Sequence, residues 1–299
     1  MTAYFDAHEQ VVDSVDALAE RVQQARALSE RTSLRFYWRG QSDAAWGVHS
    51  SLHRAIAERD GSDVTDVSEA RVTSTEKTII AEARDWIRPA LGARLTTVDV
   101  LARLQHAGAP TRLLDFTSDP HIAAYFAVAD HPHVDGRLVV AAARSRLTDA
   151  IRNAFDVPWA RGHAAKPQRW FAEVYAFEDH ADFLRITRQK GVFLGGGTPS
   201  TQPQRLLAGN RLLASQVRAS LSIPLVLHQW SQAEAAANGG AVGGRDPTVA
   251  SALTLRIPVA SNAAITAELE AAGISHAQLF PDEAGLIRYA PSLTGLVDR

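Results

Sequence analysis

Residues 104–117 read LQHAGAPTRLLDFT, and this stretch decides how the chain folds around it. The apolar spacing from Thr97 to Gln105 predicts a helix, which the Gly108-Ala109-Pro110 cluster ends. The residues from Arg112 to Phe116 then predict a short strand. Burying so many polar groups around one turn is costly unless they pair or bind a ligand, so the stretch predicts a polar network.

The segments that flank this stretch predict a helix after it and a strand before it. Ser118 or Asp119 suits the N-cap of a helix whose first residue is Pro120, a favoured position for proline. Residues 34–38 predict an aromatic strand that ends in a turn at Arg39-Gly40-Gln41. Apolar periodicity or a suitable cap predicts three further helices, over Glu9–Glu30, Val67–Pro89 and Ser261–Gly273.

Strand-like runs recur over most of the chain, at residues 136–143, 171–177, 191–194, 224–227 and 253–259. A glycine-rich segment at residues 235–251 is predicted to be a mobile loop inside the domain. The pattern predicts an α/β (α+β) fold with a mixed, antiparallel-rich sheet flanked by helices. We expect an N-terminal helical segment over residues 1–32 and one domain over residues 33–299.

Composition removes several classes of chemistry. The chain of 299 residues has no cysteine, which excludes disulfides, Cys-ligated zinc, iron–sulfur clusters and a thiol nucleophile. No apolar run approaches the roughly 18 residues that a bilayer span needs, so we expect a cytoplasmic protein that does not enter membranes. The formal net charge of −2 creates no global field for nucleic acid, so any polyanion site must be local.

One stretch departs from this charge balance. Between Phe183 and Ala233 there are six basic residues and no acid. This excess of basic residues indicates an anion-binding face, or it reflects the general abundance of arginine throughout the chain. The six candidates for a nucleic-acid contact are Arg185, Arg188, Lys190, Arg205, Arg211 and Arg218.

The polar residues of the two central segments are candidates for one ligand pocket. Arg39, beside Gly40, suits an anionic group that approaches closely, or it is a structural arginine paired with Asp115. Arg112 is either a second phosphate clamp or half of a buried ion pair. The expected lining residues are Arg39, Gln41, Gln105, His106, Thr111, Arg112, Asp115 and Thr117.

Histidine supplies the candidate acid or base. His106 precedes a turn that exposes it, so it is a candidate general acid or base, with a hydrogen bond to a loop carbonyl as the alternative. Asp115 then holds an arginine or orients a base. We predict no metal site, because the pairs His131/His133 and His49/His53 have no evident further ligand. Four aromatic residues are expected mainly in the core, namely Trp38, Phe116, Tyr125 and Phe126.

Three motifs together resemble the FRG domain, a family named for an aromatic-Arg-Gly motif. They are Arg39-Gly40-Gln41, then QHAGAPTRLLDFT at residues 105–117, then Ala123-Ala124-Tyr125-Phe126-Ala127. The resemblance extends over roughly residues 35 to 290, and it implies a family without an established reaction. Family members often carry an acid before a glycine near the end, where this chain has Ala284 before Gly285.

The order of these segments is also similar to the layout of ADP-ribosyltransferases. In that group an arginine or histidine ends the first strand and holds NAD, a Ser/Thr-bearing strand shapes the nicotinamide pocket, and a glutamate near the C-terminus completes the site. Arg39-Gly40, Phe116-Thr117-Ser118 and Glu283 stand in this order here. The likeness implies NAD as substrate. Glu283 equally suits a solvated or capping acid of a short terminal helix.

Three hypotheses follow. The first is a nucleotide-binding effector that uses NAD as an ADP-ribosyltransferase-like enzyme or glycohydrolase, in bacterial toxin action or anti-phage defence. The second is a metal-independent nuclease with His106 as base and the arginines Arg39 and Arg112 on the phosphate. The third is a module that binds a nucleotide-like small molecule or a partner without chemistry.

Overall fold

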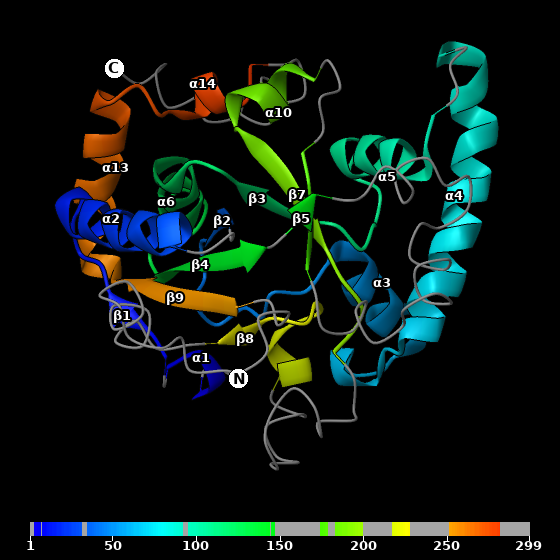
Figure 1. Ribbon diagram of the computed structural model, residues 1–299, viewed down its shortest axis with the longest axis horizontal. Helices are drawn as coiled ribbons and strands as arrows, with labels where there is room; N and C mark the ends of the chain where they lie inside the picture. Colours follow the sequence, from blue (N-terminus) through cyan, green and yellow to red (C-terminus); the bar gives the residue numbers. More distant parts are fainter. Residues whose placement is uncertain are drawn as a thin grey trace, which may run out of the picture.

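The computed structural model describes residues 3–6, 8–31, 35–91, 95–143, 145–146, 174–178, 183–199, 217–227 and 251–281. Nine strands within these residues form one sheet in the order β1-β9-β4-β2-β3-β7-β6-β5, with β8 paired to β9 (Figure 1). The pairs β1–β9, β8–β9 and β5–β6 are parallel, and the other pairs are antiparallel. This mixed, mostly antiparallel sheet confirms the predicted fold class.

The strands are β1 Gln10–Val11, β2 Arg35–Gln41, β3 Leu114–Thr117, β4 Gly136–Ala143, β5 Ser145–Arg146, β6 Tyr175–Phe177, β7 Gly191–Gly195, β8 Val226–Leu227 and β9 Ser251–Ile257. The α-helices are α1 Ala3–Asp6, α2 Val15–Arg31, α3 Ser51–Asp60, α4 Glu69–Leu91, α5 Thr97–His106, α6 Pro120–Val128, α10 Leu184–Arg188, α13 Asn262–Ala271 and α14 His276–Leu279. Two short 3₁₀ helices span Val64–Asp66 and Val259–Ser261.

The predicted cap of α6 is confirmed. Asp119 is the N-cap residue, and its Oδ1 accepts a 2.9 Å hydrogen bond from the backbone N–H of His121. Pro120 is the first helical residue, where its missing N–H costs nothing. The end of α5 is also confirmed, because Gly108 follows it with φ of +83°, a conformation that favours glycine.

The helix predicted from Glu9 begins only at Val15. Gln10 and Val11 pair instead with Leu255 and Arg256 of β9, so the residues before the helix are used as a strand. The predicted loop at residues 235–251 lies outside the described residues up to Ala250, and so does the start of the predicted run at 171–177.

The turn predicted at Arg39-Gly40-Gln41 is wrong, because β2 continues through all three residues. Strand β4 lies beside it and pairs with its whole length, including Arg39 with Val139 and Gln41 with Arg137. Strand β4, about 100 residues later in the chain, provides backbone hydrogen-bond partners for these residues. These hydrogen bonds favour the extended conformation over the turn that the local sequence predicts.

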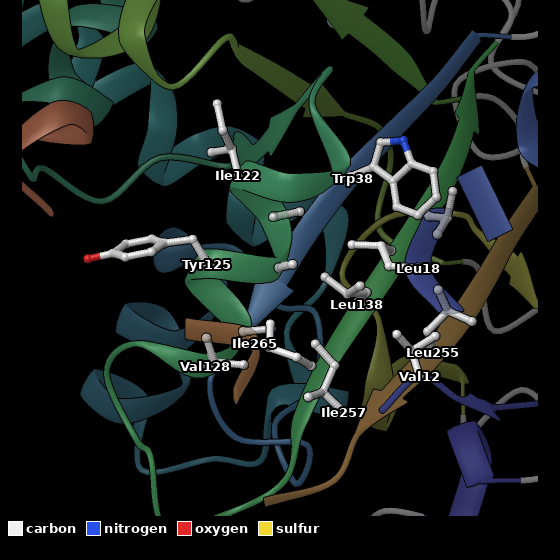
Figure 2. Packing of buried hydrophobic residues seen from close by; sticks show 14 of the residues in the cluster. Val12, Leu18, Trp38, Ile122, Tyr125, Val128, Leu138, Leu255, Ile257 and Ile265 are labelled. Carbon is white, nitrogen blue, oxygen red and sulfur yellow. The ribbon is translucent and has the colours of Figure 1, made fainter. Parts of the chain in front are cut away.

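One face of the sheet packs against α2, α6 and α13 (Figure 2). Leu18 of α2, Ile122 of α6 and Ile265 of α13 meet Leu138 of β4 and Leu255 of β9 in one buried cluster. The alternation of side chains along a strand places Trp38 on this face and Tyr37 on the other. The predicted core position of Trp38 is confirmed, as it is 3% exposed.

The other face is covered by α1 and by residues 217–227. Phe5, Leu221 and Ile223 pack there against Tyr37 and Phe116 of the sheet. Figure 1 shows the long helix α4 beyond α5, at the edge of the molecule that is opposite α13. No helix among the described residues is long and apolar enough to cross a membrane.

Candidate functional site

A cavity of about 360 Å³ lies where β2 and β3 separate. The two strands share one paired position, Trp38 with Thr117. Next to it the Arg39 side chain spans the gap, and its Nη1 donates a 2.7 Å hydrogen bond to the backbone carbonyl of Asp115. The two remote segments that the sequence analysis singled out therefore meet at one cavity.

The cavity contains most of the predicted pocket residues. Those that line it are Arg39, Gly40, Gln41, Gln105, His106, Asp115 and Thr117. The other lining residues are Trp38, Ser42, Trp46, Phe116, Phe126, Asp130, Arg185, Ile186, Gln189, Gly191, Val192, Phe193 and Phe280. Thr111 and Arg112 are not among them.

Arg39 is half-buried, and its guanidinium is only partly used by the protein. Its bond to Asp115 goes to the backbone carbonyl. Its Nε is buried without a hydrogen-bond partner among the described residues. Burial lowers the pKa of Arg39 from its ordinary value, an effect that the Asp115 carboxylate opposes, and the side chain stays cationic at neutral pH. The arrangement keeps a positive charge at the cavity.

A chain of hydrogen bonds holds the Asp115 carboxylate. The hydroxyl of Thr111 accepts a 3.2 Å hydrogen bond from the N–H of Leu113 and donates to Oε1 of Gln105. Because that contact fixes the Gln105 amide, its Nε2 donates a 2.9 Å hydrogen bond to Oδ2 of Asp115. Thr111 is itself fully buried, held by hydrogen bonds to Ser51. The predicted polar network is present, and it presents an exposed, oriented carboxylate.

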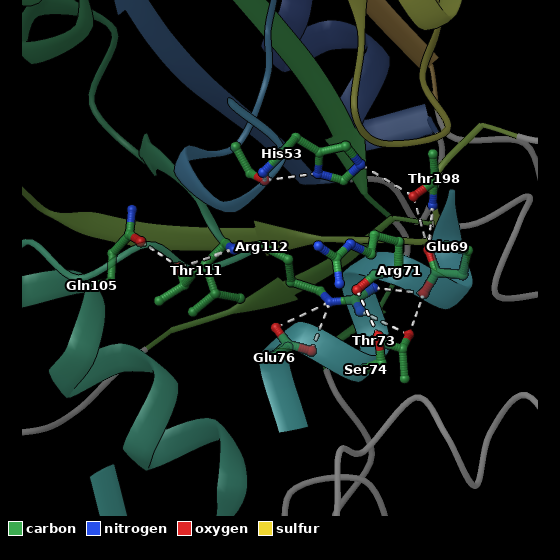
Figure 3. Close-up of polar contacts among 12 residues, drawn as sticks. His53, Glu69, Arg71, Thr73, Ser74, Glu76, Gln105, Thr111, Arg112 and Thr198 are labelled. Atoms are coloured by element: carbon green, nitrogen blue, oxygen red, sulfur yellow. Dashed lines mark hydrogen bonds and ion pairs between the residues drawn. The ribbon is translucent and has the colours of Figure 1, made fainter. Parts of the chain in front are cut away.

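The expectation that Arg112 lines the same pocket is wrong. Its side chain is 2% exposed and points toward α4, where its Nε donates to both oxygens of Glu76 at 3.1 and 3.0 Å. Its Nη1 donates to Glu69 at 2.8 Å and its Nη2 to Thr73 at 3.1 Å (Figure 3). A buried arginine is tolerated only with such partners, so Arg112 fastens α4 to the start of β3.

Comparison with known proteins identifies the part of the chain that supplies most of the cavity lining. A family model described as the FRG domain matches residues 34–136. The chain carries an FRG domain. No match was found among curated proteins or among solved structures.

The glycine of the FRG motif serves packing against α6 rather than close approach of a ligand. A Cβ on Gly40 would lie 2.0 Å from the carbonyl oxygen of Ala123 and 2.6 Å from the backbone nitrogen of Ala127. The missing side chain of Gly40 is therefore what lets the α6 backbone lie directly on β2. The prediction that Gly40 makes room for a phosphate is wrong, because the space of its missing side chain is taken by the α6 backbone. Gly40 nevertheless borders the cavity.

His106 and Thr117 lie in the wall of the same FRG cavity. The His106 ring packs against Phe183 with 4.2 Å between ring centroids and 31° between the ring planes. Thr117 is structural as well as lining, since its Oγ1 donates a 2.8 Å bond to the Gln189 carbonyl and accepts the N–H of Asp119 at 3.0 Å. His106 is the one histidine among the lining residues that the structure describes.

The described residues of the basic stretch make different contacts. Arg185 lines the cavity and lies 5.3 Å from the centroid of the Phe280 ring. Lys190 donates to Asp119 at 2.8 Å, and Arg218 donates to the Val67 carbonyl at 3.1 Å. The other three members are Arg188, which is exposed, and Arg205 and Arg211, which lie outside the described residues.

The described residues contain no group of three or more His, Asp or Glu that could hold a metal ion. His53 is buried, with Nδ1 3.0 Å from the Ser50 hydroxyl and Nε2 3.2 Å from the Thr198 hydroxyl. His49 meets the Arg218 carbonyl at 3.1 Å. Glu283, the predicted C-terminal acid, lies outside the described residues.

Several residues of the cavity were not predicted from the sequence. Trp46 and Phe280 line it, and neither was a candidate. Phe126 was expected mainly in the core but is half-buried and borders the cavity, whereas Tyr125 and Phe116 are buried as predicted. One signal was available, because Trp46 is a large apolar residue in a short polar loop directly after the Arg-Gly-Gln motif.

Proposed function

We propose that this FRG domain binds a phosphate-bearing nucleotide of the NAD class and cleaves its N-glycosidic bond, to transfer or to hydrolyse ADP-ribose. One observation carries the proposal: the Arg39 guanidinium and the oriented Asp115 carboxylate belong to the wall of one cavity. The volume of about 360 Å³ lies within the usual range for small-molecule sites. Aromatic walls beside an arginine suit a ligand with both rings and phosphates.

The proposed chemistry needs a cation for the phosphates and a carboxylate for the ribose. The bond between ribose C1′ and the pyridinium nitrogen breaks, and its electron pair leaves with the nitrogen, so nicotinamide departs as a neutral molecule. Positive charge develops on C1′ and the ring oxygen, where Asp115 stabilises it. The oxygen of water or of an acceptor hydroxyl bonds to C1′ and loses its proton to His106. Arg39 holds the pyrophosphate.

The chain order of the proposed parts supports an ADP-ribosyltransferase-like reading at the level of analogy. Arg39 lies two residues before the end of the first long strand, Thr117 ends the next, and α6 follows directly. In this proposal Asp115 supplies the carboxylate near the ribose, and Glu283 is a second candidate for that role. Consumption of NAD by such an enzyme would arrest growth of a cell that expresses it, as expected of a toxin or defence effector.

Nicotinamide release by the purified full chain tests the proposal. The protein is incubated with NAD, with and without a lysate as acceptor source, and nicotinamide is quantified by chromatography. Arg39→Ala is expected to lower release by about 10- to 100-fold, the loss expected when bonds to a charged group are removed. Asp115→Asn keeps the shape and is expected to lower kcat by roughly 100-fold.

The matched control is Arg71→Ala. Arg71 makes an exposed ion pair with Asp60 and does not line the cavity, so this variant should match the wild-type rate. No nicotinamide release under any of these conditions, with the protein folded, would overturn the proposal. Tight NAD binding without turnover would point to the binding-module hypothesis.

The nuclease hypothesis receives less support from the geometry. It placed both Arg39 and Arg112 on a phosphate, and Arg112 is enclosed by Glu69 and Glu76. RNA and DNA incubated with excess chelator provide the discriminating measurement, with His106→Ala as the variant that should lose any cleavage.

A further inference from the structure

Trp46 stands out among the exposed apolar side chains of the described residues. Of the six large ones, which are Val11, Trp46, Trp86, Val134, Leu184 and Val259, Trp46 is the one that lines the cavity. It is 45% exposed. A tryptophan with nearly half of its surface in water, at the wall of a cavity, offers a flat apolar ring to a ligand that enters.

The exposure of Trp46 is built into a fixed loop. The Trp46 N–H donates to the Asp43 carbonyl at 3.2 Å, and the Trp46 carbonyl accepts a bond from Nη1 of Arg137 at 3.3 Å. Gln41 Nε2 donates to the Gly47 carbonyl at 3.1 Å. A Cβ on Gly47 would lie 2.5 Å from the His49 ring, so the loop is also tightly packed there. These contacts hold the backbone of Trp46 on both sides.

The ring of Trp46 also has a neighbour. The His131 ring lies nearly perpendicular to it, with 5.1 Å between centroids and 83° between planes. Nδ1 of His131 in turn lies 2.8 Å from the hydroxyl of Ser42, a further lining residue. A ring fixed by its backbone and by a hydrogen-bonded neighbour loses little conformational entropy when a ligand stacks on it, which favours binding.

We propose that Trp46 is the stacking platform for the nucleobase of the ligand, held in place by the Ser42–His131 pair. The ligand class is a planar heteroaromatic ring joined to a sugar phosphate, with Arg39 on the phosphate and Trp46 on the base. This inference deepens the proposed function, on which it rests for the nature of the ligand. It makes no use of turnover, so binding experiments test it separately.

Calorimetric titration of the full chain with two probes tests the assignment. AMP carries a base and a phosphate, whereas ribose 5-phosphate carries the phosphate alone. Trp46→Ala is expected to weaken AMP binding by about 5- to 100-fold, the range for losing one base–aromatic stack. It should leave the weaker binding of ribose 5-phosphate unchanged. Trp46→Phe, which keeps a flat ring, should retain most of the affinity for AMP.

Trp86→Ala is the matched control, because Trp86 is 87% exposed on α4 and does not line the cavity. Near-UV circular dichroism establishes that each variant is folded. Equal AMP affinity in Trp46→Ala and wild type would overturn the inference, and so would an equal loss for both probes or no AMP binding at all. Base-dependent binding through Trp46 without nicotinamide release would refute the proposed reaction and leave the stacking site intact.

Discussion

Acid is expected to destabilise this domain mainly through the buried histidine His53. His53 is 3% exposed, between the hydroxyls of Ser50 and Thr198. Burial, followed by the nearby charge of Arg112, lowers its pKa from the ordinary 6.5 to about 3. The folded protein therefore keeps His53 neutral at pH 5, whereas the same histidine is protonated in the unfolded chain.

The size of the effect follows from the two pKa values. The contribution of neutral His53 to the free energy of unfolding is complete above pH 6.5 and is lost as the pH falls toward 3. In this range the unfolded chain binds a proton at this histidine and the folded protein does not. A pH of 5 lies about 1.5 units below the pKa of the histidine in the unfolded chain. At 1.36 kcal/mol per unit, the free energy of unfolding is therefore about 2 kcal/mol lower at pH 5 than at pH 7. His49 acts in the same direction, since burial lowers its pKa too.

Urea unfolding at pH 7, 6 and 5 measures this loss. Wild type should lose about 2 kcal/mol or slightly more over the range. His53→Asn removes the titrating ring and retains a polar side chain, so its free energy of unfolding should depend less on pH by about the same amount. The lower starting stability of the variant does not matter, because only the two slopes are compared. Equal slopes for wild type and His53→Asn would refute the reasoning.

Two further predictions concern the polar chain and the packed strand. Thr111→Val removes the hydroxyl that orients Gln105 and should lower kcat for nicotinamide release by roughly 10-fold through Asp115, whereas Thr111→Ser should preserve it; equal rates in the two variants would contradict this role. Gly40→Ala puts a Cβ 2.0 Å from the Ala123 carbonyl and should cost about 3 kcal/mol of unfolding free energy, and a loss below about 1 kcal/mol in urea titrations would contradict the packing account.

The sequence predicted best those features that depend on neighbouring residues. Asp119 followed by Pro120 is a complete local signal, and the helix begins there. Gly108 ends α5 for an equally local reason. The alternation and cap signals needed no knowledge of distant segments, so most predicted helices and strands are found near their predicted bounds.

The partners of Arg39 and Arg112 could not be predicted from the residues that neighbour them in the sequence. Arg112 is enclosed because Glu69 and Glu76 lie across from it on α4, 43 and 36 residues away. Among the described residues, the hydrogen bond of Arg39 goes to a backbone carbonyl, and its Nε has no hydrogen-bond partner. In the sequence, both arginines have neighbours that are compatible with phosphate binding. Their environments differ because helix α4, which is remote in sequence, supplies carboxylates to Arg112.

The aromatic-Arg-Gly segment joins the core to the cavity because its side chains alternate across the sheet. Trp38 and Gly40 face α6, where one fills the core and the other lets the helix backbone approach, while Arg39 belongs to the opposite register. Strand β2 stays paired with β4 along its whole length but pairs with β3 at one position. The Asp115 carbonyl therefore has no backbone donor from β2. The Arg39 guanidinium replaces the missing backbone donor. One side chain thus closes the gap in the sheet and keeps its charge at the cavity wall, so the structural role of Arg39 is compatible with the ligand-binding role that we propose for it.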